Sequence, residues 1–113
     1  MIKVGLVGFG LSGRWLQAPF FVLNPNFHLK YIVTSQEIGQ DLFEGTEKAS
    51  DLDQLLADPE IDLISICSPS STHFEYSKKA LNAGKHVLVE KPMTATYEEA
   101  QELIALAKQV NKT

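Results

Sequence analysis

The sequence has almost no cysteine: Cys67 is the single one among 113 residues. This excludes an internal disulfide and a cysteine-based zinc site, and it suits the reducing cytosol, so we expect a cytoplasmic protein. No apolar run approaches the roughly 18 residues that a membrane span needs. The N-terminal segment, residues 1–9, makes a poor signal peptide because Gly5 and Gly8 interrupt its short apolar run.

Positive charge is also scarce. Ten Lys and Arg residues stand against 14 Asp and Glu residues, which gives a formal net charge of −4 and an isoelectric point near 5.3. The chain has no stripe of basic residues that would form a footprint for nucleic acid or anionic lipid. We therefore expect no nucleic-acid partner and no membrane partner.

Short β-rich runs alternate with runs of helical period along the chain. Strands are predicted at residues 2–7, 29–34, 61–67 and 86–89, with a weak one at 47–49; the pattern otherwise fades between residues 36 and 50, which predicts an irregular connection. This alternation and near-continuous apolar strands predict an α/β fold, a doubly wound parallel sheet forming one domain over residues 1–113.

Helix boundaries are marked by capping residues. Thr72 and Thr96 are each followed three residues later by Glu, the spacing of a capping box, and Ser50 is a weaker start. Gly84 is predicted to end the helix after Thr72 in a left-handed conformation.

A glycine pattern, G-x-G-x-x-G, follows the first predicted strand and opens a helix. Gly8 permits the tight turn, Gly10 lets the backbone approach a pyrophosphate, and Gly13 allows close packing of the helix, whose N-terminus favours phosphate. The alternative is that these glycines form a turn and nothing more. The candidate cofactor-binding residues here are Gly8, Phe9, Gly10, Leu11, Ser12 and Gly13.

The end of the second predicted strand bears on the choice between NAD and NADP. An acidic residue there usually holds the ribose of NAD and a basic one accommodates NADP, yet neither type stands at residues 34–36. Thr34, Ser35 and Gln36 can hydrogen-bond a 2′-phosphate without repelling it, whereas Glu37 reaches a ribose diol if the turn bends toward it. We favour NADP slightly, although an ordinary polar strand end has the same residue types.

The segment after the third strong strand, residues 67–73, should border the same ligand, because ligands in open α/β sheets lie over the carboxyl ends of the strands. Ser68, Pro69 and His73 are therefore candidate cofactor contacts. For His73, a hydrogen bond within its own loop is an equally good interpretation. Cys67 is interpreted as a small core residue rather than a nucleophile.

Glu90, Lys91 and Pro92 follow the fourth strong strand. Proline restricts Lys91 to an extended conformation and favours a cis bond more than other residues do. A fixed ammonium there can polarise a substrate oxygen and stabilise an alkoxide. From the residues alone, a solvated Glu-Lys pair before a turn is the stronger interpretation.

Together these segments resemble the N-terminal domain of the glucose–fructose oxidoreductase, inositol dehydrogenase and rhizopine-catabolism (Gfo/Idh/MocA) family. The resemblance rests on residues 4–10, on residues 68–73 and above all on residues 80–92, which read ALNAGKHVLVEKP. It implies a Rossmann-type fold, Lys91 as the catalytic lysine, Glu90 beside the nicotinamide ribose and a cis peptide before Pro92.

Members of this family are typically much longer and carry a C-terminal domain for substrate binding and oligomerisation, which would be absent here. The resemblance thus implies that this chain is the N-terminal, cofactor-binding part of an NAD(P)-dependent dehydrogenase or reductase and is inactive alone. The whole enzyme would transfer hydride to or from a sugar, polyol or related carbonyl compound, as a homo-oligomer without a metal. The histidines of this sequence do not match the family's catalytic one.

Two alternatives stay open. One is a non-catalytic regulator that binds the dinucleotide as a ligand, against which the presence of Lys91 argues mildly. The other is a self-associating fragment whose uncovered sheet edge pairs with another copy.

Overall fold

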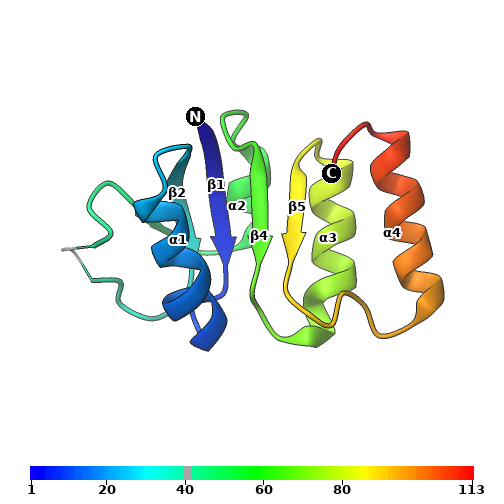
Figure 1. Ribbon diagram of the computed structural model, residues 1–113, viewed down its shortest axis with the longest axis horizontal. Helices are drawn as coiled ribbons and strands as arrows, with labels where there is room; N and C mark the ends of the chain where they lie inside the picture. Colours follow the sequence, from blue (N-terminus) through cyan, green and yellow to red (C-terminus); the bar gives the residue numbers. More distant parts are fainter. Residues whose placement is uncertain (40–41) are drawn as a thin grey trace.

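The protein folds around one sheet of five parallel strands in the order β3-β2-β1-β4-β5 (Figure 1). The computed structural model describes residues 1–39 and 42–113. The predicted Rossmann-type α/β class is confirmed, and the second strand begins two residues earlier than expected. The strands are β1 Ile2–Val7, β2 Phe27–Val33, β3 Glu47–Ala49, β4 Leu63–Ile66 and β5 His86–Val89.

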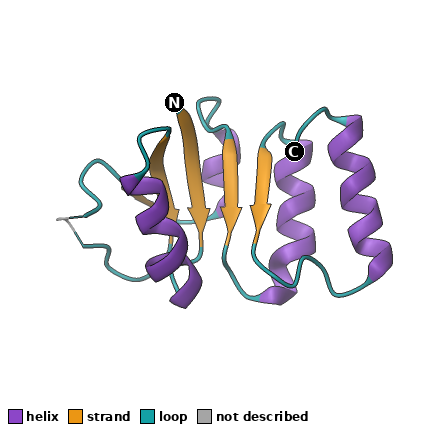
Figure 2. Ribbon diagram, in the orientation of Figure 1, coloured by secondary structure: helices purple, strands orange, loops and turns teal. Residues whose placement is uncertain are grey.

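Helices connect the strands and lie on both faces of the sheet (Figure 2). In Figure 1 the first helix stands in front of the sheet and α2 lies behind it. The helical elements are the π-helix η1 Ser12–Gln17, α1 Ala18–Leu23, α2 Leu52–Ala57, the 3-10 helix η2 Ser70–Thr72, α3 His73–Asn82 and α4 Tyr97–Gln109.

Two apolar clusters fill the two sides of the sheet. Because side chains alternate along a strand, the central strand β1 contributes to both clusters, with Val4 and Leu6 in one and Val7 in the other. The cluster under α1 contains Val4, Leu6, Phe9, Ala18, Phe21, Leu29, Ile32 and Phe43. The cluster under α2 and α3 contains Val7, Ala49, Leu52, Leu55, Ile61, Ile64, Ile66 and Ala80.

The first helix begins as a π-helix, which the sequence pattern did not predict. The Ala18 amide donates to the Gly13 carbonyl, five residues back, whereas the Arg14 amide donates to the Gly10 carbonyl at 2.9 Å. Pro19 follows directly, and its ring would clash with a carbonyl one turn earlier in a regular α-helix. The wider turn makes room for the proline without ending the helix.

The helix starts agree with the sequence in one case of three. The predicted capping box of α4 is confirmed: the Thr96 hydroxyl accepts from the Glu99 amide, and the Glu99 carboxylate accepts from the Thr96 amide, both at 3.2 Å. The box predicted at Thr72 is wrong, because η2 precedes α3 and the Thr72 hydroxyl instead donates to the Pro69 carbonyl at 2.6 Å.

At α2 the cap is Asp51 rather than Ser50. The Asp51 carboxylate accepts from the Gln54 amide at 2.9 Å. The predicted left-handed end of α3 is confirmed by a φ of 78° at Gly84. The connection between β2 and β3 is irregular where it is described, and residues 40 and 41 of that prediction lie outside the described residues.

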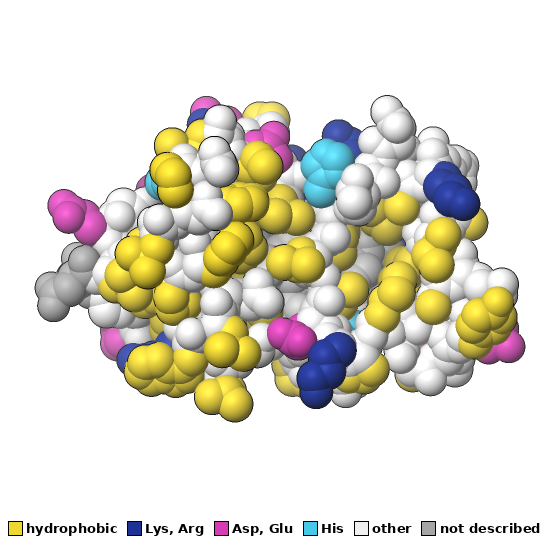
Figure 3. All heavy atoms as spheres, viewed as in Figure 1, with side chains coloured by type: hydrophobic (Ala, Val, Ile, Leu, Met, Phe, Trp, Pro, Cys, Tyr) yellow, Lys and Arg dark blue, Asp and Glu magenta, His cyan; other side chains and the backbone are white. Residues whose placement is uncertain are grey.

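The α1 face of the sheet is covered only in part by the described residues. Figure 3 shows hydrophobic side chains gathered over α1 and beside it on this face. On β5, Leu88 points to this side and is 44% exposed, and Trp15, Leu16 and Phe20 of the first helix are also exposed. No helix of the described chain is long and apolar enough to cross a membrane.

Candidate functional site

The candidate site lies at the edge where the carboxyl ends of the parallel strands meet. All arrowheads in Figure 1 point to that edge, so the loops that follow the strands converge there. These loops are residues 8–13 after β1, 34–36 after β2, 67–72 after β4 and 90–92 after β5. The four segments singled out from the sequence are therefore brought together by the fold.

Backbone hydrogen bonds extend the sheet into these loops. The amides of Gly8, Cys67 and Glu90 donate to the last carbonyl oxygens of β2, β1 and β4 at 3.0, 2.8 and 2.9 Å. The first residue of each loop is thus held in register with its neighbouring strand. The loops start from fixed positions, which is what a preorganised binding site requires.

The glycine turn has the steric properties that its pattern predicts. Gly8 has a φ of 96°, and a Cβ there would lie 2.8 Å from the Cys67 carbonyl carbon. A Cβ on Gly13 would overlap the Gly8 carbonyl oxygen, so a glycine is needed where the helix crosses the turn. Gly10 differs, because no atom lies within 4 Å of the place of its Cβ. Its backbone is open to the approach of a ligand.

Phe9 and Leu11 lie between these glycines and play different parts. The Phe9 ring is 2% exposed and packs edge-on against Phe43, with 5.7 Å between ring centroids. Phe9 therefore offers a ligand its backbone and not its side chain. The Phe9 carbonyl accepts a hydrogen bond from the Gln36 side-chain amide at 3.3 Å, whereas Leu11 is 78% exposed.

Ser12 links the glycine turn to the loop after β5. Its hydroxyl donates to the Glu90 carboxylate at 2.5 Å and lies 3.7 Å from the Cys67 sulfur. The Ser12 hydroxyl, together with the Lys91 amide at 3.0 Å, lowers the pKa of Glu90, so this carboxylate stays ionised. Nothing in the sequence pattern indicated this contact, which joins residues 78 positions apart.

The side chains of Cys67 and His73 make their contacts within the same loops. Burial raises the pKa of the Cys67 thiol, which agrees with a packing residue rather than a nucleophile. His73 is 2% exposed, and its ring nitrogens lie 2.7 Å from the Pro92 carbonyl and 2.9 Å from the Ser68 carbonyl. Of the two interpretations of His73, the structure shows the hydrogen bond within its own loop.

Lys91 is exposed and follows directly after the edge strand β5 and Glu90. Its ammonium makes no ion pair with any residue in the described ranges, and the Lys91–Pro92 peptide bond is cis, as the resemblance implied. His28 of β2 and His86 of β5 lie near the amino ends of their strands, whereas Lys91 follows the carboxyl end of β5. The lysine is thus free to contact a ligand, and His73, which contacts the neighbouring Pro92, has both ring nitrogens within hydrogen-bond distance of backbone carbonyls.

A cleft of about 520 Å³ lies at the ends of β2 and β3. The Thr34 hydroxyl accepts from the Gln36 amide at 3.0 Å, and Ser35 is exposed. Lys48, which sequence reasoning missed, places its ammonium 3.3 Å from the Ser35 carbonyl. The sequence signal that could have identified Lys48 was the weak strand predicted at residues 47–49. A strand paired with β2 places its own carboxyl end beside this cleft. The lining residues are Val33, Thr34, Ser35, Lys48, Ala49 and Ser50.

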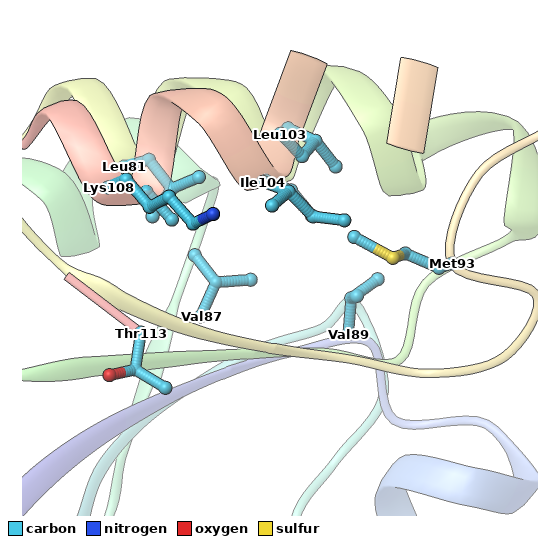
Figure 4. Close-up of a pocket in the computed structure, with 10 residues that line it drawn as sticks. Leu81, Val87, Val89, Met93, Leu103, Ile104, Lys108 and Thr113 are labelled. Carbon is cyan, nitrogen blue, oxygen red and sulfur yellow. The ribbon is translucent and has the colours of Figure 1, made fainter. Parts of the chain in front are cut away.

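A second cavity, of about 310 Å³, lies between β5, α3 and α4 and has a different chemistry (Figure 4). Val87, Val89, Met93 and Ile104 point toward one another in Figure 4, and the lining is almost entirely aliphatic. Its polar members are Ser77, Lys108 and Thr113, and none of its described lining residues comes from the glycine turn or from a loop that follows β1, β2 or β4. We therefore place the candidate site at the strand ends, not here.

The residues at the strand ends suit a dinucleotide. The open backbone at Gly10 accommodates a pyrophosphate, and the cleft between β2 and β3 lies where an adenosine ribose binds in folds of this class. Within residues 1–39 and 42–113, no three His, Cys, Asp or Glu side chains are grouped to hold a metal ion. A parallel sheet with a glycine turn after its central strand defines a Rossmann-type nucleotide-binding domain.

The chain belongs to the Gfo/Idh/MocA oxidoreductase family with an NAD-binding Rossmann fold, whose model matches residues 2–113. It is 39% identical over 104 residues to scyllo-inositol 2-dehydrogenase (NADP⁺) IolW of Bacillus subtilis, covering 90% of this chain and 29% of the relative. The chain therefore spans about a third of the length of such relatives.

Solved structures agree with this assignment. D-galactose-1-dehydrogenase from Rhizobium etli superposes with a TM-score of 0.87 at 34% identity, over 99% of this chain and 35% of that one. GenD2 from gentamicin A biosynthesis, solved in complex with NAD, gives a TM-score of 0.89 at 30% identity, over 99% of this chain and 33% of that one. Both forms of the cofactor occur among these relatives, since IolW is named for NADP⁺ and GenD2 was solved with NAD.

Proposed function

We propose that this chain is the cofactor-binding half of an NAD(P)-dependent oxidoreductase that acts on a sugar, a polyol or a related carbonyl compound. The observation that carries the proposal is the convergence of Gly10, Glu90 and Lys91 at one edge of the sheet, with the Gly10 backbone open and the Lys91 ammonium unpaired among the described residues. The relatives named for scyllo-inositol and D-galactose support the substrate class.

Each residue has a separate task in this proposal. The amides of residues 8–13 hold the pyrophosphate, and a bound nicotinamide supplies or accepts the hydride. Lys91 donates a hydrogen bond to the substrate oxygen and stabilises negative charge that develops there. Glu90, kept ionised by Ser12, borders the nicotinamide ribose.

Two further parts of the proposal concern the whole protein. The proton of the substrate hydroxyl is taken by a base outside this chain, since His28 and His86 lie far along their strands from Lys91 and His73 is buried in loop contacts. The 113-residue chain alone is then a binding unit without turnover. The complete protein is a cytoplasmic homo-oligomer.

The choice of cofactor follows from the cleft between β2 and β3. None of the described residues that line it carries a carboxylate, and Ser35 presents an exposed hydroxyl, so we propose a preference for NADP. Gln36, considered with Thr34 and Ser35 from the sequence, has its side-chain amide bonded to the Phe9 carbonyl.

The test is calorimetric titration of the 113-residue chain with NADPH and NADH. Wild type should bind with one-to-one stoichiometry. Gly10→Asp should abolish binding of both without unfolding the chain, because its side chain enters open space and places a carboxylate against the pyrophosphate. Lys91→Ala should bind nearly as well as wild type, since its role is in the transition state.

Ala105→Asp is the matched control, because it adds the same charge at an exposed position of α4. It should bind like wild type. Equal loss of binding in Gly10→Asp and Lys91→Ala, both folded by circular dichroism, would defeat this division of roles.

A further inference from the structure

We propose that Lys48 selects NADP over NAD by binding the 2′-phosphate of the adenosine ribose. The inference rests on the proposed dinucleotide-binding function and names the residue that determines its specificity. Lys48 stands in the short edge strand β3, outside the glycine turn and outside the segment after β2 in which the sequence pattern placed the specificity residues.

The position of Lys48 follows from strand register. In the parallel pair of β2 and β3, Ile32 is opposite Lys48 and Val33 is opposite Ala49. Ile32 belongs to the cluster under α1 and Ala49 to the cluster under α2. Because side chains alternate, Lys48 lies on the α1 side of the sheet, the side on which the glycine turn begins its helix.

The Lys48 ammonium is held at the mouth of the cleft. It donates to the Ser35 carbonyl at 3.3 Å, which brings its charge from β3 to the end of β2. It forms no ion pair within the described residues, so its charge is not neutralised by a described carboxylate. The exposed Ser35 beside it adds a second donor.

The carboxylates of Glu47 and Asp51, which flank the cleft in sequence, are directed elsewhere. Glu47 alternates with Lys48 and so lies on the α2 side of β3, and Asp51 caps α2 by accepting from the Gln54 amide. A cleft with an ammonium, hydroxyls and no carboxylate among its described lining residues suits a phosphate dianion. A ribose diol, in contrast, is normally held by a carboxylate.

The experiment measures the ratio of the NADPH and NADH affinities by calorimetry for wild type, Lys48→Gln and Lys48→Arg. Wild type should bind NADPH with about tenfold higher affinity than NADH, a ratio that one charge-assisted hydrogen bond can supply. Lys48→Gln should weaken NADPH binding by about tenfold and leave NADH binding unchanged. Lys48→Arg should keep the preference, because it keeps the charge.

Lys79→Gln is the matched control, since Lys79 is a half-exposed lysine on α3 whose nearest carboxylate is 3.8 Å away. It should leave both affinities unchanged. The wild-type preference should also shrink as salt is raised, whereas a steric preference would not.

The outcomes separate this inference from the function on which it rests. Binding of both cofactors with a preference for NADH, or a preference that Lys48→Gln leaves intact, overturns the assignment of Lys48 alone. Equal weakening of both cofactors in Lys48→Gln also overturns it, because it indicates a general effect on the fold. Binding of neither cofactor by folded wild type overturns the proposed function and this inference together.

Discussion

At the scale of single residues, Asp58 makes contacts through both its carboxylate and its backbone carbonyl. It follows α2, and its side chain contacts the Lys30 ammonium at 2.6 Å and accepts from the Glu60 amide at 2.9 Å. Its carbonyl accepts from the Lys85 ammonium at 2.8 Å. The hydrogen bond from Lys30 lowers the pKa of Asp58 from 3.8 to about 2. This residue joins β2 to the turn that precedes β4, at the edge opposite the candidate site.

Asp58 should therefore give the protein a pH-dependent part of its stability. A carboxyl whose pKa is depressed by folding stabilises the native state above its unfolded pKa, and this contribution is lost as the pH falls through the folded value. Asp58→Asn should lower the free energy of unfolding by about 1 kcal/mol at neutral pH. The difference from wild type should vanish between about pH 4 and pH 2.

Urea denaturation at several pH values measures this difference. Asp53→Asn is the control, because the Asp53 side chain is 75% exposed and 3.8 Å from Lys79, and it should change little at any pH. A deficit of Asp58→Asn that stays constant down to pH 2 would show that the charge of Asp58 is not what stabilises the turn.

At the scale of elements, the capping box of α4 carries a prediction of its own. Thr96→Ala removes the acceptor of the Glu99 amide and should lower the free energy of unfolding by about 1 kcal/mol, with a melting temperature lower by roughly 4 °C. Ser71→Ala should have no measurable effect, because its hydroxyl is exposed and bonds to no described residue. Thermal unfolding followed by circular dichroism measures the melting temperatures of wild type and both variants. Equal melting temperatures for wild type and Thr96→Ala would contradict the role of the cap.

The order of strands and helices was predictable because each strand is a short, nearly continuous apolar run. Local details were less predictable where two signals compete at one position. Thr72 has the spacing of a capping residue, yet the hydroxyl turns to the Pro69 carbonyl within η2. Pro19 lies within the first helix, where a π-helical turn accommodates its ring, and no sequence pattern indicated that turn.

The place of the candidate site at the ends of the strands was predictable from the sequence, as at Gly10. For Lys91 the residues alone favoured a solvated pair, and only the family resemblance implied a role. The site was not predictable where it depends on contacts between distant segments. The pair Ser12 and Glu90 and the approach of Lys48 to the end of β2 both arise from the order of strands in the sheet, which local patterns do not contain.

At the scale of the whole molecule, helices cover one face of the sheet, whereas the described residues cover the α1 face only in part. The radius of gyration of 13.3 Å is that of a compact domain of this length. Leu88 on β5 and the apolar side chains of the first helix nevertheless stay exposed on the α1 face, and an aliphatic cavity opens beside β5 (Figures 3 and 4). The polar site and these apolar surfaces are separate features of the molecule.

The central claim is that four loops at the carboxyl ends of the strands form one dinucleotide site. Titration of the ¹⁵N-labelled chain with NADPH, followed residue by residue through its amide NMR signals, tests this most directly. The account predicts that the shifted signals gather in residues 8–13, 34–36, 48–50, 67–69 and 90–91. Shifts confined to β5, α3 and α4 around the aliphatic cavity, with the glycine turn unchanged, would contradict it.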